Sequence, residues 1–130
     1  MIKFAYTILY VQDVTRSIKF YETAFGFARK FISPVNDYGE LLAGETTLSF
    51  ASISLAGSNL HDGFIESSLD NKPFGIEIGF TTLNVEETLN NAIAAGATLV
   101  EKPKTKPFGQ TVAYVRDPDG FLVEICTPME

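Results

Sequence analysis

The pattern of apolar and polar residues repeats along the chain. Residues 4–27 and 75–99 each begin with an apolar or alternating run, pass a polar residue before a valine, continue with helical spacing and reach a glycine. At an offset of 71 residues the equivalent positions are Asp13 with Asn84, Val14 with Val85 and Ile18 with Leu89. Self-similarity of this kind indicates two modules of related structure.

Each repeat predicts one amphipathic helix after its first strand. Asp13 and Asn84 suit N-cap positions, because their side-chain oxygens can accept hydrogen bonds from the first free amides of a helix. The apolar residues expected on the buried helical faces are Val14, Ile18, Tyr21 and Phe25 in the first repeat and Val85, Leu89, Ala92 and Ile93 in the second. Gly26 and Gly96 end these helices, since glycine readily adopts the left-handed conformation.

Strands are predicted for the rest of each repeat. They are expected at 4–11, 28–33, 39–43 and 46–55 in the first repeat, and at 76–81, 98–101, 110–116 and 121–127 in the second. Pro118 and Gly120 favour a tight turn between the last two strands. The order is therefore βαβββ twice, which predicts an α+β fold. We expect one domain over residues 1–130, with module one at 1–55, a polar linker at 56–74 and module two at 75–130.

Alternation along the strands assigns residues to two sheet faces. The triplets expected beneath the helices are Ile76, Ile78 and Phe80 in one strand and Phe121, Val123 and Ile125 in another. This leaves Glu77 and Glu124 on the opposite face, and the offset of 71 places Glu77 at the position of Tyr6. Carboxylates on an inner sheet face need an explanation, because a buried unpaired charge is costly.

Composition narrows the function classes. The 130 residues are 45% hydrophobic and 20% charged, which is the balance of a soluble globular domain. The net charge of −6 disfavours nucleic acid as a partner, and the longest apolar stretch is too short to cross a membrane. One cysteine, Cys126, and one histidine, His61, exclude an intrachain disulfide and the usual zinc sites. We expect a cytoplasmic protein with His61 at the surface and Cys126 as a packed thiol.

Short segments spread over nearly the whole chain carry a family resemblance. They are residues 10–14, Ser17, 20–21, 25–27, 96–97, 107–110, 117–121 and 124–125. Together they resemble the vicinal oxygen chelate superfamily, which includes glyoxalase I, bleomycin-resistance proteins and extradiol dioxygenases. The resemblance implies two βαβββ modules whose mixed sheets form a cup, usually completed in a homodimer.

The same resemblance implies where a metal would bind. Metal-dependent members place ligands on the first and last strands of each module, and here those positions hold Tyr6, Ser49, Glu77 and Glu124. Such members usually show histidine or glutamine at the Tyr6 position, glutamate at the Ser49 position in glyoxalases, and often histidine at the Glu77 position. Nickel, zinc and iron sites of this kind use imidazole with carboxylate, so no metal cofactor is favoured. A weakly bound divalent ion such as Mg²⁺, with water completing its shell, stays open.

Three interpretations of the cup follow. The favoured one is a metal-free small-molecule binding protein of the bleomycin-resistance type, with ligand contacts at Tyr6, Tyr10, Ser49, Glu77, Phe108, Gln110 and Glu124. The alternative is a metal-dependent glyoxalase-like lyase or isomerase, or a dioxygenase, acting on a small carbonyl or catechol-like substrate. In that case Glu124 and Glu77 form an acid–base pair, in which either one is the general base for a proton next to a carbonyl. In the third, the same side chains satisfy one another in a polar core that binds no ligand.

Overall fold

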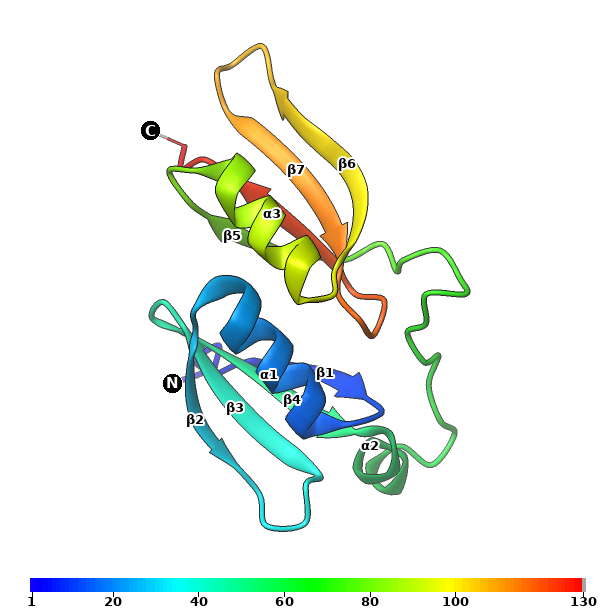
Figure 1. Cartoon of the computed structure of the whole chain (residues 1–130). Helices are drawn as coiled ribbons and strands as arrows, with labels where there is room; N and C mark the ends of the chain where they lie inside the picture. Colours follow the sequence, from blue (N-terminus) through cyan, green and yellow to red (C-terminus); the bar gives the residue numbers. More distant parts are fainter. Residues whose placement is uncertain (130) are drawn as a thin grey trace. The chain divides into compact units, whose positions relative to one another are not determined.

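The computed structural model describes residues 1–129 and contains two compact units (Figure 1). Residues 1–22 and 26–66 form the first unit, and residues 23–25 with those from 67 onward form the second. Each unit carries a four-stranded mixed sheet in βαβββ order, so the predicted α+β class is confirmed. No helix among residues 1–129 is long and apolar enough to span a bilayer.

The first unit contains β1 (Thr7–Val11), α1 (Val14–Phe25) except its last three residues, β2 (Ala28–Ile32), β3 (Tyr38–Ala43) and β4 (Thr46–Ser52). The sheet order is β1-β4-β3-β2, with β1 parallel to β4 and the other pairs antiparallel. Asp13 caps α1 by accepting a hydrogen bond from the Arg16 amide at 3.2 Å, and Gly26 ends it at φ 73°. The rings of Tyr21 and Phe50, both fully buried, lie 5.4 Å apart in the core.

The second unit contains β5 (Glu77–Thr81), α3 (Val85–Ala95), β6 (Thr98–Thr105), β7 (Thr111–Arg116) and β8 (Leu122–Cys126). Its sheet order is β5-β8-β7-β6, with β5 parallel to β8. Asn84 caps α3, because its Oδ1 accepts from the Glu87 amide at 3.0 Å while its Nδ2 donates to the Glu87 carboxylate. The fully buried side chains of this sheet are Ala113, Val115, Val123 and Ile125.

Several predicted boundaries are wrong. The strand expected at 46–55 ends at Ser52, whose hydroxyl accepts from the Leu55 amide and begins helix α2 (Ile53–Asn59). The strand expected at 98–101 continues to Thr105, because register shifts in its pairing with β7 accommodate the extra residues. Ile76 precedes β5 and is exposed, so it does not pack beneath a helix, and Ile93 is also exposed.

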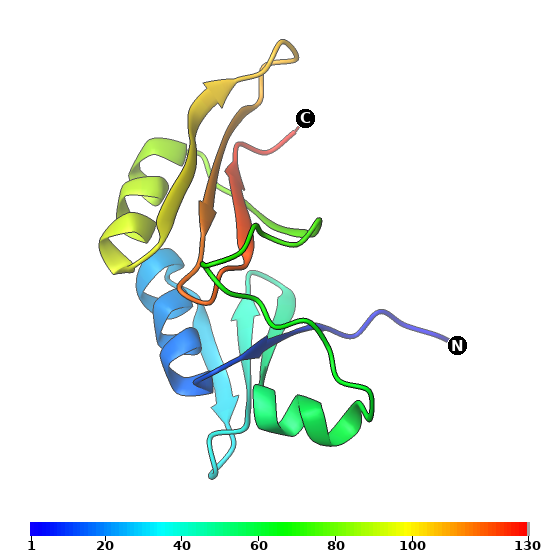
Figure 2. The same ribbon diagram turned by 90° about the vertical axis from the view of Figure 1, so that its right-hand side faces the viewer.

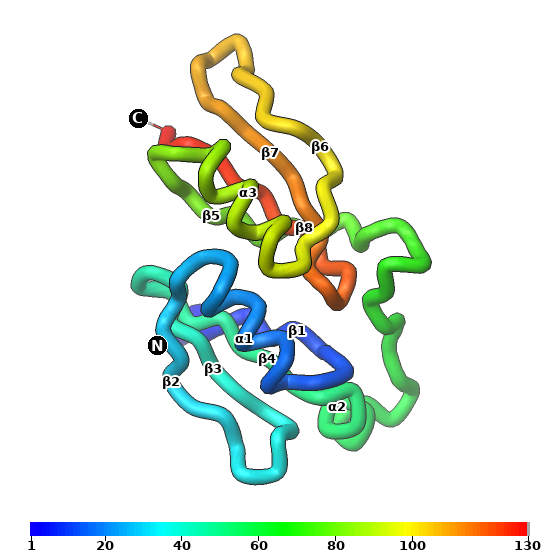
Figure 3. Tube along the Cα trace, viewed as in Figure 1, coloured from blue at the N-terminus to red at the C-terminus, as the bar shows by residue number. Residues whose placement is uncertain are grey.

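The segment between α2 and β5 has no helix or strand, yet each unit holds part of it (Figure 3). In the first unit the Phe64 ring packs edge-on against Tyr10, with centroids 4.8 Å apart. In the second unit Arg116 donates to the main-chain oxygens of Ser68 and Asn71 at 2.8 and 2.7 Å. Side chains therefore anchor this segment where regular hydrogen bonding does not.

Candidate functional site

Strand register shows which positions of the two units correspond. The paired rows are Ile8–Ser49–Glu40 in the first sheet and Gly79–Glu124–Tyr114 in the second. Ile8 and Gly79 are related by the same offset of 71 that relates the two repeats. Ser49 is therefore the positional counterpart of Glu124, and Glu40 is the counterpart of Tyr114.

Four polar side chains gather on the face of the second sheet that α3 does not cover. This acid cluster consists of Glu77, Tyr114, Glu124 and Cys126. The Tyr114 hydroxyl lies 3.0 Å from Glu124 Oε2 and 3.4 Å from Glu77 Oε1, so both carboxylates share one face. The Cys126 thiol lies 3.5 Å from Glu124 Oε1. Strands β5, β7 and β8 each contribute to the cluster because their paired rows bring these positions together.

Three groups of the acid cluster, Glu77, Tyr114 and Cys126, retain their protons more strongly than the same groups do in water. Partial desolvation of its carboxyl group, followed by the charge of Glu124, raises the pKa of Glu77. Burial, followed by the hydrogen bond to Glu124, raises the pKa of Tyr114 to about 12. Burial and the Glu124 charge also raise the pKa of the Cys126 thiol. Within residues 1–129, no lysine, arginine or histidine forms an ion pair with either carboxylate, so the negative charge is not neutralised by the chain.

We expect Glu77→Gln to stabilise the fold at about pH 8 and to leave it unchanged at about pH 4. A carboxyl whose pKa is raised by folding destabilises the native state only once it ionises, so the penalty is absent below its ordinary pKa of 4.5 and complete above the raised one. The gain should stay below about 1 kcal/mol, because Glu77 is largely exposed. Thermal unfolding at both pH values measures it. Glu101→Gln on β6, outside the cluster, is the control, and equal stabilisation of both variants would assign the effect to net charge alone.

The corresponding face of the first sheet carries a carboxylate that is paired with a lysine. The Tyr38 hydroxyl donates to Glu40 Oε2 at 2.7 Å, and Lys30 Nζ lies 3.4 Å from Glu40 Oε1. Burial is the main cause of the raised pKa of Tyr38. The nearby Ser49 hydroxyl acts to lower that pKa, although its oxygen is not placed to form a hydrogen bond. Ser49 is fully buried, and its Oγ has no hydrogen-bond partner within residues 1–129. Here the carboxylate is neutralised, unlike the pair in the second sheet.

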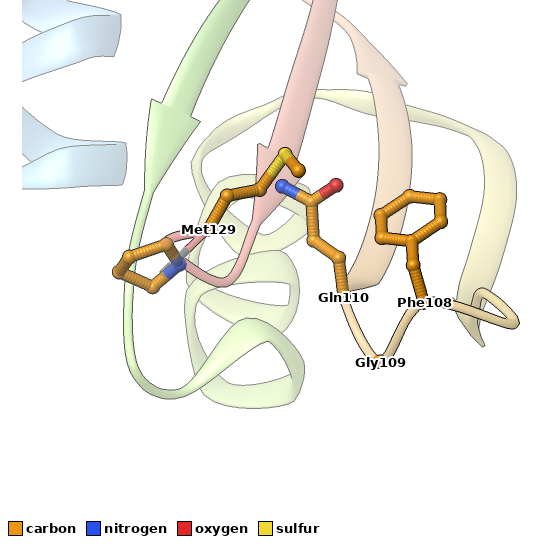
Figure 4. Close-up of a pocket in the computed structure, with 5 residues that line it drawn as sticks. Phe108, Gly109, Gln110 and Met129 are labelled. Atoms are coloured by element: carbon orange, nitrogen blue, oxygen red, sulfur yellow. The ribbon is translucent and has the colours of Figure 1, made fainter.

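The remaining predicted ligand residues lie in other places. Tyr6 is half-exposed just before β1, and Tyr10 packs against Phe64. Phe108 and Gln110 belong to a pocket of about 370 Å³ at the turn between β6 and β7 (Figure 4). Its other lining residues are Gly109, Pro128 and Met129. The Gln110 amide donates to the Thr127 carbonyl at 2.9 Å, which fixes the side chain between the Phe108 ring and Met129.

The donor set of the acid cluster does not fit a transition metal. The thiol of Cys126 and the phenol of Tyr114 hold their protons, which leaves two carboxylates as ligands. No group of three or more His, Cys, Asp or Glu side chains among residues 1–129 is placed to hold a metal ion. His61, the one imidazole of the chain, is exposed in the turn after α2. Sites for nickel, zinc or iron use imidazole with carboxylate, and the acid cluster contains no imidazole.

Comparison with solved structures identifies similar folds. A glyoxalase-related enzyme from Fulvimarina pelagi superposes with a TM-score of 0.82 at 21% identity, covering 98% of this chain and 89% of that one. A glyoxalase/bleomycin resistance protein/dioxygenase family enzyme from Burkholderia phytofirmans PsJN superposes with a TM-score of 0.79 at 24% identity, covering 96% and 98%. At these identities the likeness shows the fold.

Two curated proteins are similar to this chain in sequence. The chain is 27% identical over 125 residues to virulence protein STM3117 of Salmonella typhimurium, covering 91% of this chain and 78% of that protein. It is 29% identical over 129 residues to lactoylglutathione lyase GLX1 of Arabidopsis thaliana, covering 95% of this chain but only 43% of the lyase. A sequence model of the Glyoxalase/Bleomycin resistance protein/Dioxygenase superfamily matches residues 3–125. Because this model matches nearly the whole chain and the solved structures share its fold, this protein belongs to the Glyoxalase/Bleomycin resistance protein/Dioxygenase superfamily.

Proposed function

We propose that this chain is a small-molecule binding protein of the bleomycin-resistance type that needs no metal. It takes a ligand that carries positive charge or several hydrogen-bond donors. The acid cluster is the observation that carries the proposal, since Glu77 and Glu124 share one phenol hydroxyl and no cation of residues 1–129 pairs with them. Carboxylates held in this way attract a cationic group and accept its hydrogen bonds.

The residues of the cluster have distinct parts in this proposal. Glu124, held by the Tyr114 hydroxyl at 3.0 Å, accepts a hydrogen bond from the ligand in a fixed orientation. Glu77 is exposed at the first residue of β5, where it contacts a ligand that approaches from solvent. Further contacts from the predicted set remain proposals: Tyr6, Tyr10, Ser49, Phe108 and Gln110. The homodimer, the cytoplasmic location and the exclusion of nucleic acid and membrane partners also remain proposals.

Calorimetric titration with metal-free bleomycin, and with agmatine as a small organic cation, tests the proposal. Glu124→Gln removes the charge but keeps the shape, so we expect affinity to fall at least tenfold, which is about 1.4 kcal/mol. Glu101→Gln is the matched control and should bind as the wild type does. Binding that is equal in all three proteins would place the site elsewhere, and no binding of any organic cation would overturn the proposal.

The raised pKa of Glu77 favours a second candidate, acid–base catalysis on a small carbonyl compound. A carboxyl group with a raised pKa can serve as the acid while a neighbouring carboxylate serves as the base. Glu77 is then the acid and Glu124 the base for a proton next to the carbonyl. Conversion of lactoylglutathione, the compound in the name of the plant relative, followed in both directions, is the first assay. Turnover that disappears in Glu124→Gln would favour this candidate over simple binding.

A further inference from the structure

The face of the second sheet that carries the acid cluster extends to the edge strand β6. Figure 2 shows α3 (yellow-green) on one side of β6, β7 and β8, and the acid cluster lies on the other side. Directly paired residues of neighbouring strands project to the same side, and successive residues of one strand alternate between the two sides. The register of β6 with β7 therefore identifies the side chains of β6 that share a face with the acid cluster.

Lys104 of β6 is one of these side chains. It pairs with Val112, and Val112 pairs with Cys126, so the three residues form one row across β6, β7 and β8. The next row contains Tyr114 and Glu124, two residues further along β7 and β8. The Cys126 thiol lies 3.5 Å from Glu124 Oε1, which confirms that the two rows share a face. Lys104 therefore projects on the side of the acid cluster, two strands and one row away from Glu124.

The charges on this face are separated rather than paired. Lys104 is exposed and forms no ion pair within residues 1–129, although Glu101 occupies the next row on β6. Strands lie about 4.8 Å apart and rise about 3.3 Å per residue, so the Cα atoms of Lys104 and Glu124 are roughly 12 Å apart. Val112 and Cys126, both buried, lie between the two ends. The face therefore has an acidic end, an uncharged middle and a basic edge.

A ligand with charges of both signs satisfies both ends of this face. An organic anion is repelled by the Glu77 and Glu124 carboxylates and by the net charge of −6. A dication that spans the face is repelled at its far end by Lys104, which acts against such ligands. A zwitterion pairs at both ends, because the two carboxylates attract its ammonium group and Lys104 attracts its own carboxylate.

We propose that this face selects a zwitterion, whose cationic group binds Glu77 and Glu124 and whose carboxylate, roughly 10 Å away, binds Lys104. The uncharged row of Val112 and Cys126 contacts the chain that joins the two groups. Lys104 is thus a specificity-determining residue for the anionic end of the ligand. This specificity rests on the proposed binding of a cation at the acid cluster, and it adds the second charge that the ligand carries.

Calorimetric titration with 8-aminooctanoate and with its methyl ester tests this specificity. Both compounds have the same ammonium group and chain, but only the free acid carries a carboxylate, which an extended chain places roughly 10 Å from the nitrogen. We expect the wild type to bind 8-aminooctanoate roughly fivefold more tightly than the ester, which is the range of an exposed ion pair. Lys104→Gln should remove this preference. Lys19→Gln, which removes an exposed charge on α1, is the matched control and should keep it.

Two results would overturn the specificity and leave the proposed function intact. One is equal binding of the acid and the ester by the wild type, and the other is a preference that survives in Lys104→Gln. Lys104 is exposed, so this variant is expected to fold. Glu124→Gln tests the cationic end separately, because it should weaken the binding of both compounds. A wild type that binds neither compound would overturn both proposals.

Discussion

Replacing Arg116 with methionine is expected to destabilise the chain by about 3 kcal/mol. The guanidinium is buried and donates to three main-chain oxygens, those of Gly120 at 3.0 Å, Asn71 at 2.7 Å and Ser68 at 2.8 Å. Methionine fills a similar length but donates nothing, so these carbonyls lose their partner. Since two of them belong to the segment before β5, that segment should detach from the turn at 117–120.

Urea unfolding measures this loss, as a lower midpoint at an unchanged slope. Cleavage by a glutamyl endopeptidase after Glu66, which lies just before the anchored residues, should also accelerate. Arg29→Met is the matched control: its guanidinium forms a half-exposed ion pair with Glu22 at 2.9 Å and should change stability by no more than about 0.5 kcal/mol. Equal unfolding midpoints for the two variants would contradict a structural role for Arg116.

Helices α1 and α3 were predicted from the sequence because their start and stop signals are local. Asp13 and Asn84 bond to amides three residues away, and the glycines that end the helices follow directly. Helix α2 was missed although Ser52 caps it in the same way, because Ile53 and Leu55 continue an apolar run that also suits a strand. Propensity alone does not separate these outcomes over so short a segment.

The anchoring of the segment before β5 could not be predicted from local sequence. Arg116 lies 45 and 48 residues from the carbonyls that it binds. Nothing in the polar composition of residues 60–74 specifies such a partner. The arrangement depends instead on the turn at 117–120, which places the main chain of Gly120 next to the same guanidinium.

Most of the acid cluster was within reach of sequence reasoning. Alternation placed Glu77 and Glu124 on one face, and the turn signal at 117–120 contains the information that adds Tyr114. Tyr114 and Glu124 each lie five residues from Asp119, so a hairpin closed there pairs them, as the register shows. Glu40 in the first sheet follows from the same counting. The pKa shifts, in contrast, depend on burial, which spacing does not reveal.

Gly39→Ala is expected to destabilise the first unit by about 1 to 3 kcal/mol, because no room exists for a methyl group where α1 crosses β3. A Cβ at this position would lie 2.5 Å from Ile18 Cδ1 and 3.2 Å from both Val14 Cγ1 and the Phe31 carbonyl oxygen. Ile18 and Val14 are fully buried, so neither can move aside without disturbing the core. The steric penalty therefore exceeds the entropy that alanine saves in the unfolded chain.

Gly57→Ala provides a control of opposite sign for this prediction. Gly57 lies inside α2, and a Cβ there meets no atom within 4 Å. Alanine should therefore stabilise the chain by up to about 1 kcal/mol through helix propensity alone. Thermal unfolding of the two variants separates close packing from backbone freedom. If Gly39→Ala also stabilises, α1 does not pack against β3 as closely as these distances require, and the first sheet is covered in a different way.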